Sequence, residues 1–278
     1  MKKILAILLA VLMLCGLCGC AEQSAYSDLT IMADVKLSDQ ELYGIAFRHG
    51  SDMTAKLDDI TAKLFENGEL KKIAQTYGIA DNLPATYTPS TDATVEGDSD
   101  YEYIKGKGKL VIGITNFAPM DYLNEKGEWI GFDADFARKV CEELGVTPEF
   151  KEINWGSKDM ELQTKSIDCV WNGMTITPAM LEAADVTGGY MTNYQVIVVK
   201  DAKKFKTTAD LKGKTVVAEG GSAGEAAALA NDDLKDNFKP VDSQADALLQ
   251  VKSGAADACV IDLLMASAMI NGIVKVEE

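Results

Sequence analysis

Two stretches of the sequence combine Gly, Ser and Thr where a strand pattern gives way to a helix pattern, an arrangement that can bind an anion. The first is the run NGMTITP at 172–178, in which Thr177 suits a helix N-cap and Pro178 suits the first helical position. The second is the run EGGSAG at 219–224. Backbone N–H groups at such junctions suit a carboxylate or a phosphate, and in open α/β sheets they lie where ligands bind. Turn glycines without a ligand are the alternative for either stretch alone, and no Lys-Ser/Thr follows the Gly pair as a P-loop requires.

Three more residues stand just after predicted strands, where they can meet a small molecule. Asp262 follows the apolar run 259–261 and opens a helix, so by itself it predicts an N-cap more than a ligand contact. Phe117 and Trp155 can enclose a small molecule or pack in the core. His49 is the single histidine, so any Ser-His-Asp or Cys-His catalytic group depends on one residue, and we expect no metal site and no cofactor.

The elements that position these residues alternate between strand and helix from residue 108 onward. With helices between most of them, the predicted strands fall at 110–115, 149–153, 167–171, 195–199, 214–218, 238–241 and 258–261. Such alternation predicts an α/β fold with mainly parallel sheets flanked by helices. Residues 24–81 predict a strand at 43–47 and two helices, a piece too small to bury a core, so it must pack on the rest. Residues 82–107 are rich in Pro, Thr, Ser and Asp and predict a linker.

The overall charge excludes several classes of partner. The chain has 278 residues, with 27 Lys and Arg against 43 Asp and Glu and a net charge of −16. Nucleic-acid binding requires clustered basic residues, and adhesion to anionic lipid requires the same, so neither partner is expected. The hydrophobic fraction of 47% and the charged fraction of 25% are typical of globular protein, in one large domain or two of ordinary size.

The first residues are typical of an exported protein. Two lysines precede an apolar run of eleven residues at 4–14, which is too short to span a bilayer, so residues 1–19 are predicted to be a signal peptide. The sequence LCGC at 17–20 resembles the lipobox of bacterial lipoproteins, in which the last Cys is lipidated. Cys20 is therefore expected to anchor the protein to the membrane surface, with the body of the chain outside the cytoplasm.

Five short phrases stand out between residues 108 and 278. They are KLVIG at 109–113, GEWIGFD at 127–133, IDCVWNGMTIT at 167–177, TTADLKGK at 207–214 and GAADA at 254–258. Each phrase alone is weak, but all five occur in the order found in one family, so most of 108–278 resembles the extracellular solute-binding proteins of polar amino-acid ABC importers.

The resemblance implies a two-lobed periplasmic-binding-protein-like fold, with two hinge strands joining the lobes, and it implies roles for particular residues. Asp262 corresponds to the residue that receives the ligand's α-ammonium group. The other implied site residues bind the α-carboxylate (Gly173, Thr175, Ser222 and Ala223), enclose the ligand's side chain (Phe117 and Trp155), or line the pocket (Asn116, Met120, Asn172, Met180 and Gly221). Met180 stands where the family usually has an Arg that binds the carboxylate. Either helix-terminal N–H groups replace that Arg, or the ligand is not a standard α-amino acid.

The order of the segments differs from that of the family. The phrases ELYGIAFR at 41–48 and GELKKI at 68–73 resemble the family's returning hinge strand and last helix, although here they come first. We therefore expect a circular permutation, and the alternative is a remnant of two tandem copies that exchange pieces between chains. The expected division is signal peptide (1–19), lipidated tether and strand (20–39), hinge strand and C-terminal helices of lobe 1 (40–81), linker (82–107), lobe 1 (108–194) and lobe 2 (195–278).

Together these features predict a lipid-anchored extracytoplasmic receptor. It is expected to capture a small zwitterionic ligand, an amino acid, in a cleft between the lobes and to deliver it to an ABC permease without catalysis. One alternative is an enzyme on the same scaffold, of the small-carboxylic-acid dehydratase type, for which Asp262 is the obvious acid. The other alternative is a sensor that passes lobe closure to another protein.

Overall fold

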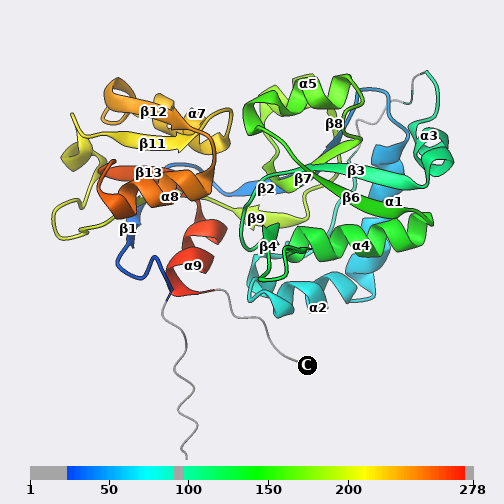
Figure 1. The fold of residues 1–278 in the computed structure, drawn as a ribbon, viewed down its shortest axis with the longest axis horizontal. Coiled ribbons are helices and arrows are strands. Elements are labelled where there is room, and N and C mark those ends of the chain that lie inside the picture. The colour runs from blue at the N-terminus through cyan, green and yellow to red at the C-terminus, as the bar shows by residue number, and fades with distance from the viewer. Residues whose placement is uncertain (1–23, 91–94, 96, 273–278) are drawn as a thin grey trace, which may run out of the picture.

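The chain folds into two α/β lobes that lie side by side (Figure 1). The computed structural model describes residues 24–90, 95 and 97–272. The predicted signal peptide and the predicted lipidation site, Cys20, lie outside these described residues. Within them, every helix is too short or too polar to cross a bilayer.

The sheet of lobe 1 carries the first glycine-containing junction. Its strand order is β6 (Thr147–Glu152), β3 (Lys109–Ile114), β7 (Cys169–Thr175), β2 (Glu41–Phe47) and β8 (Asp185–Val186), and β9 (Met191–Asn193) also pairs with β2. One face is covered by α1 (Met53–Glu66), α2 (Glu69–Thr76) and α4 (Phe132–Leu144), and the other by α5 (Lys158–Gln163) and α6 (Pro178–Ala183) (Figure 1). A small antiparallel pair joins β4 (Tyr122–Leu123) to β5 (Trp129–Ile130).

The sheet of lobe 2 carries the second junction and Asp262. Its strand order is β1 (Thr30–Lys36), β10 (Gln195–Val199), β13 (Ala258–Asp262), β11 (Val216–Glu219) and β12 (Phe238–Val241). The helices of this lobe are α7 (Ala223–Ala230), α8 (Gln244–Ser253) and α9 (Leu263–Asn271). Short 3-10 helices cover Ala80–Asn82, Trp155–Ser157, Thr208–Leu211 and Lys235–Asn237.

The sheets are mixed, whereas the sequence predicts mainly parallel ones. In lobe 1, β3 runs parallel to β6 and β7, and β2 runs antiparallel to β7, β8 and β9. In lobe 2, β11 runs parallel to β12 and β13, and β10 runs antiparallel to β1 and β13. The antiparallel strands are those that pass between the lobes, and the alternation of strand and helix does not reveal their direction.

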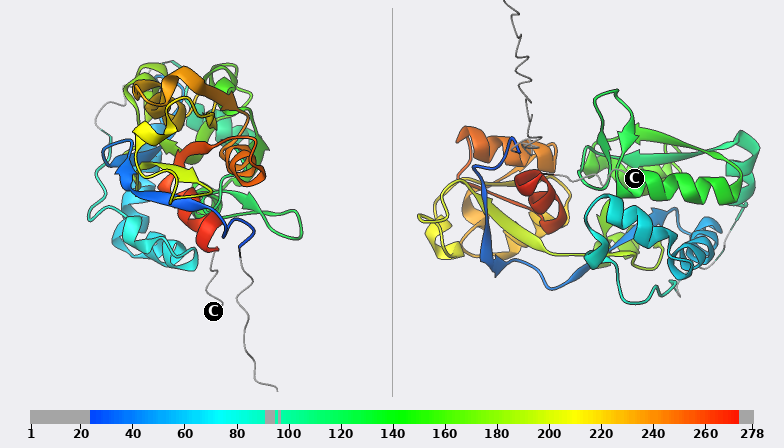
Figure 2. Two further views of the ribbon diagram at one scale, coloured as in Figure 1. Left: turned by 90° about the vertical axis from the view of Figure 1, so that its left-hand side faces the viewer. Right: turned by 90° about the horizontal axis from the view of Figure 1, so that it is seen from below.

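The lobes are joined where β1 continues into β2 and where β9 continues into β10 (Figure 2). These two connections lie next to each other, because Leu37 N donates to Gln195 O at 2.9 Å and Gln195 N donates to Ser38 Oγ at 2.9 Å. Paired connections of this kind are suited to a hinge, since a small change of backbone angles in few residues moves a whole lobe.

Local sequence signals account for the ends of the helices at both junctions. Thr177 Oγ1 accepts the N–H of Met180 at 3.1 Å at the start of α6, and Ser222 Oγ accepts the N–H of Glu225 at 3.1 Å at the start of α7. Such caps satisfy N–H groups that have no partner within a helix. Gly145 ends α4 with a left-handed φ of 68°, a conformation that glycine adopts without steric cost.

The segment 24–81 packs on both lobes, as its small size predicts. Its β1 pairs with β10 in lobe 2, and its β2 lies inside the sheet of lobe 1. The apolar faces of α1 and α2 join the main hydrophobic core through side chains including Leu57, Leu64 and Leu70. The three cysteines of the described chain, Cys141, Cys169 and Cys259, are buried and unpaired, as expected of small core residues.

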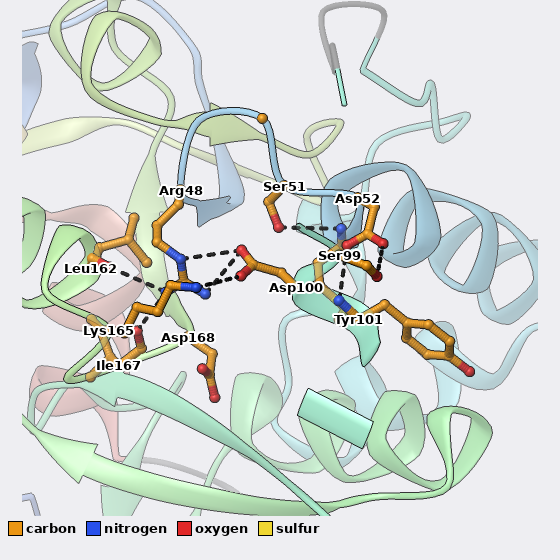
Figure 3. Close-up of polar contacts among 12 residues, drawn as sticks. Arg48, Ser51, Asp52, Ser99, Asp100, Tyr101, Leu162, Lys165, Ile167 and Asp168 are labelled. Atoms are coloured by element: carbon orange, nitrogen blue, oxygen red, sulfur yellow. Dashed lines mark hydrogen bonds and ion pairs between the residues drawn. The ribbon is translucent and has the colours of Figure 1, made fainter. Parts of the chain in front are cut away.

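An ion pair also fixes this segment to lobe 1 (Figure 3). Arg48, which follows β2, pairs with Asp100 at 3.0 Å and donates to Leu162 O and Ile167 O at 3.2 and 3.0 Å. Asp100 belongs to α3 (Asp100–Lys107), so the last eight residues of the predicted linker form a helix instead. Ser99 caps this helix. The sequence does not predict the helix, because it is short and polar and buries too few residues to show an apolar pattern.

Candidate functional site

A cavity of about 600 Å3 lies between the lobes, at the carboxyl ends of strands from both sheets. Lobe 1 contributes the end of β7, the start of α6 and the turn that follows β6. Lobe 2 contributes the end of β11, the start of α7, the end of β13 and the start of α8. Both glycine-containing junctions therefore face the same cavity, as the sequence analysis anticipates.

Most of the residues that the resemblance implies lie on the wall of this cavity. They are Phe117, Trp155, Asn172, Gly173, Thr175, Met180, Gly221, Ser222, Ala223 and Asp262. Asn116 and Met120 do not lie there, contrary to expectation. The turn after β3 folds back through the Met120 N to Phe117 O hydrogen bond of 2.8 Å, which leaves Met120 fully buried behind the wall and Asn116 exposed.

Gly173 shapes the wall by its backbone rather than by a contact of its N–H with the cavity. Its φ is +55°, and a Cβ at this position would lie 2.4 Å from Phe117 Cε1. The Gly173 N–H donates to Asp133 Oδ2 at 2.6 Å. A glycine is therefore required because the Phe117 ring packs against its backbone.

Two buried carboxyl groups lie behind this wall. Asp133 also accepts from the Tyr190 hydroxyl at 2.8 Å, and Asp121 accepts from Asn172 Nδ2 at 2.8 Å. Burial raises the pKa of Asp133 to about 7, and burial together with the nearby charge of Asp133 raises the pKa of Asp121 well above its ordinary value. Through these hydrogen bonds the two carboxyl groups hold Asn172 and Gly173 in position from the side away from the cavity.

Asp262 stands at the N-cap position of α9, but its side chain does not cap the helix. Its Oδ1 accepts from Tyr43 Oη at 2.8 Å, from Gln195 Nε2 at 3.0 Å and from Asn193 Nδ2, and its Oδ2 accepts from Gln244 Nε2. Burial raises the pKa of Asp262 to about 6, and these hydrogen bonds oppose the rise. The carboxylate is thus held in place by neutral donors from both lobes.

The start of α7 presents backbone N–H groups that can bind an anion, and some of them already have acceptors within the protein. Glu225 Oε2 accepts the Gly221 N–H at 2.6 Å, and Ser222 Oγ accepts the Glu225 N–H. Ala223 occupies the first helical position, where a backbone N–H has no acceptor within the helix. The N-terminal dipole of α7 therefore faces the cavity, with the Glu225 carboxylate beside it.

The cavity wall has no Arg among the residues that the structure describes. Met180 is buried at this wall, and the two arginines lie elsewhere, since Arg48 pairs with Asp100 and Arg138 pairs with Asp135. No other described Arg therefore takes the place of the Arg that the resemblance leads one to expect at position 180.

Several residues of the wall carry charge that the sequence analysis does not assign to the site. Lys158, at the start of α5, donates from Nζ to Gly221 O at 3.0 Å and so links the two lobes. Glu219 ends β11 directly before the Gly pair, Asp159 and Glu225 also line the wall, and so does the neutral Gln244. The position of Glu219 at the end of a strand was the signal available in the sequence. Among the described residues, no group of His, Cys, Asp and Glu side chains has the arrangement of a metal site.

Comparison with known proteins gives matches that agree with this geometry. The profile described as bacterial extracellular solute-binding proteins, family 3, matches residues 110–254. The arginine-binding extracellular protein ArtP of Bacillus subtilis (strain 168) is 30% identical over 178 residues, which is 62% of this chain and 68% of ArtP. Across four curated relatives, the aligned part spans 62–68% of the relative's length.

Solved structures show the same similarity. The arginine-bound form of truncated ArgBP from T. maritima is 34% identical, with a TM-score of 0.56, and the match covers 61% of this chain and 80% of that one. The ancestral amino-acid-binding protein AncCDT-1, a precursor of cyclohexadienyl dehydratase, is also 34% identical, with a TM-score of 0.58 and coverage of 64% and 81%.

Proposed function

The chain belongs to family 3 of the bacterial extracellular solute-binding proteins, and we propose that it captures an amino acid between its lobes and delivers it to an ABC permease. The observation that carries this proposal is the interlobe cavity. The Asp262 carboxylate and the N-terminus of α7 meet there at the carboxyl ends of both sheets. A zwitterion has one positive and one negative group, and these two features supply a partner for each.

The position of the cavity suits capture by closure of the lobes. Each lobe contributes part of the wall, so a bound molecule touches both and favours the closed arrangement over the open one. The paired connections between the lobes supply the hinge. Binding in this way requires no bond to be made or broken, which agrees with the transport roles of the relatives.

A thermal-shift screen of the amino acids tests the proposal. A ligand present at 100 times its Kd adds about 2.7 kcal/mol to the free energy of unfolding, so a specific ligand raises the melting temperature by several degrees. Recovery of the amino acid unchanged after incubation separates binding from the dehydratase alternative, and uptake by cells with and without the gene separates transport from sensing. A screen in which no amino acid stabilises the protein would contradict the proposal.

The role of Asp262 has its own test. Asp262→Asn keeps the shape of the side chain and removes the charge, so affinity for the selected amino acid is expected to fall by about 2–5 kcal/mol. Asp246→Asn is the matched control, because Asp246 is exposed at the start of α8 in the same lobe and does not line the cavity. Equal affinities of the Asp262 variant and the wild type would remove Asp262 from the ammonium site.

We also propose that Cys20 carries a lipid anchor outside the cytoplasm. The lipobox-like sequence at 17–20 supports this proposal, as does the extracellular character of the family. Cys20→Ala is expected to move the protein from the membrane fraction to the medium or periplasm, whereas Cys18→Ala leaves it at the membrane. Membrane fractionation that is the same for both variants would refute the anchor.

We further infer that residues 40–81 take the place of the family's C-terminal hinge strand and helices. The family profile matches only 110–254, and β2 pairs with β7, β8 and β9 inside lobe 1. A variant in which 24–81 is moved behind residue 278 through a flexible linker is expected to fold and bind as the original order does. Loss of folding in that variant, when the original order folds, would argue against a permutation.

A further inference from the structure

Glu219 is a carboxyl group on the cavity wall that its surroundings do not satisfy. The residue ends β11, which lies between β13 and β12 in the lobe 2 sheet, and 3% of its surface is exposed. Its Oε1 is fully buried and has no hydrogen-bond partner in the part of the chain that the structure describes. An unpaired buried polar atom costs free energy and a buried unpaired charge costs more, so such a group calls for a specific explanation.

The nearest basic residue is engaged elsewhere. Lys158 Nζ donates to Gly221 O at 3.0 Å and to Trp155 O at 3.4 Å, and within the described residues it makes no ion pair with Glu219. Burial raises the pKa of Glu219 to about 8, the charges of Asp262 and Asp246 raise it further, and Lys158 opposes the rise. Lys158 therefore moderates the field at Glu219 without serving as its partner.

Asp262, beside Glu219 on the same lobe, leaves little acceptor capacity for a ligand. Its Oδ1 already accepts three side-chain hydrogen bonds, whereas Oδ2 accepts one, from Gln244. A carboxylate oxygen has two lone pairs, so the acceptor position left for a ligand is the second one on Oδ2. The lobe 2 wall thus has two separate carboxyl groups, Asp262 and Glu219, that can each accept a hydrogen bond from a ligand.

The charge of the whole wall favours a ligand with a net positive charge. Its acidic members are Asp159, Glu219, Glu225 and Asp262, and Lys158 is the basic member among the described residues. A neutral zwitterion brings one positive and one negative group, and therefore leaves Glu219 buried without a partner. A second positive group gives Glu219 that partner in a water-excluded site, where ionic hydrogen bonds are strong.

We infer that Glu219 is a specificity-determining residue that accepts an ionic hydrogen bond from a cationic side chain of the ligand, so that the cavity selects positively charged amino acids over neutral ones. This inference rests on the proposed function, since it takes the ligand to be an amino acid whose α-ammonium meets Asp262. The aromatic wall fits the same ligand class. Phe117 and Trp155 offer apolar surface for a long alkyl stem between the two charged ends.

Isothermal titration of matched ligand pairs tests the inference. L-citrulline has nearly the shape of L-arginine without its charge, and L-norleucine stands in the same relation to L-lysine. The wild type is expected to bind at least one cationic member roughly tenfold or more tightly than its neutral partner, as for a buried charge pair. In Glu219→Gln this preference is expected to shrink to within about threefold, while the affinity for the neutral member stays unchanged or rises.

Asp246→Asn is the matched control for charge alone. Asp246 is exposed, lies outside the cavity wall and is close enough to raise the pKa of Glu219, so its removal changes the field in the cavity without removing a contact. The preference for the cationic ligand is expected to change by less than about twofold in this variant. An equal loss of preference in the Asp246 and Glu219 variants would overturn the inference of a direct contact.

Proton release provides a measurement on the wild type itself. Because the pKa of Glu219 is about 8, the carboxyl group is mostly protonated at pH 7, and pairing with a cation displaces that proton. Titration in buffers of different ionisation enthalpy is therefore expected to show close to one proton released per L-arginine or L-lysine bound, and none for the neutral partners. The charged groups that act on Glu219 are Asp262, Lys158 and Asp246. Proton release that is unchanged in Asp246→Asn shows that the exposed charge of Asp246 is not its cause.

Three results would overturn the inference and leave the proposed function standing. They are equal affinity for cationic and neutral partners, a parallel loss of affinity for all amino acids in Glu219→Gln, and binding of a cationic ligand without proton release. Failure of every amino acid to bind the wild type is a different result, because it overturns the proposed function itself.

Discussion

Replacing Glu219 by Gln is expected to stabilise the ligand-free protein at alkaline pH. The substitution preserves the shape of the side chain and removes its ability to ionise. In the wild type the pKa of Glu219 is raised from 4.5 to about 8, because burial disfavours the charged form. Between these two values the folded protein holds a proton that the unfolded chain releases, so the free energy of unfolding falls as pH rises through this window. The Gln variant lacks this loss.

The size of the effect follows from the shift and from the burial of the residue. At about 1.36 kcal/mol for each tenfold change in proton affinity, the shift corresponds to at most roughly 5 kcal/mol above pH 8. Entry of water and rearrangement of Lys158 reduce this value, so we expect about 2 kcal/mol. For a chain of this size, that gain raises the melting temperature by roughly 4–8 °C at pH 8.5, with little difference at pH 5.

Thermal unfolding of both proteins at pH 5, 7 and 8.5 measures the effect, after refolding from denaturant to remove bound amino acids. Asp133 also has a raised pKa, and its contribution cancels when the variant is compared with the wild type at each pH. The charge of Asp262 raises the pKa of Glu219, so the measured difference includes the repulsion between these two carboxylates. Glu225→Gln is the control, because Glu225 also lines the cavity but is partly exposed and already accepts a hydrogen bond from Gly221. A stability difference that is the same at pH 5 and pH 8.5 would refute the argument.

Three further substitutions test the architecture around the cavity. Gly173→Ala is expected to lose about 2–4 kcal/mol in urea unfolding, from the left-handed backbone and the clash with Phe117, and a loss below 1 kcal/mol would contradict this. Arg48→Met removes the closer of the two basic partners of Asp100 and leaves Lys165 at 3.5 Å, so it is expected to cost about 1.5–3 kcal/mol, part of which Asp100→Asn restores in the double variant. Lys158→Met removes the hydrogen bond across the cleft, worth about 1 kcal/mol, so small-angle scattering without ligand should show a larger radius of gyration than the wild type.

The sequence was sufficient to predict most of the elements and their caps. The predicted strands at 195–199 and 238–241 coincide with β10 and β12, and Thr177 caps its helix as predicted. Such features depend on residues within a few positions of one another, so a single sequence contains the information they need. The two-lobed fold and the family were likewise predicted, because motifs in a fixed order restrict the arrangement of the whole segment.

Features that depend on contacts between distant residues could not be predicted in this way. The antiparallel direction of β2 follows from its pairing with strands more than a hundred residues later, and α3 at the end of the expected linker is held by the ion pair between Arg48 and Asp100. Neither feature leaves a periodic apolar pattern of its own, which is the signal that local analysis uses.

The residues of the cavity also divide into those that local sequence predicts and those that only distant contacts place. Sequence alone determined that two glycine-containing junctions and Asp262 end strands, and the carboxyl ends of strands in such folds face a ligand. Only the tertiary structure decided that Met120 turns into the core and that the oxygens of Asp262 are held by Tyr43, 219 positions earlier in the chain, and by other neutral donors. It also decided that Glu219 Oε1 finds no hydrogen-bond partner among the residues that the structure describes. The reason is physical: whether a carboxylate is paired depends on which donors the fold brings within about 3 Å of it, and those donors come from the opposite lobe and from remote strands.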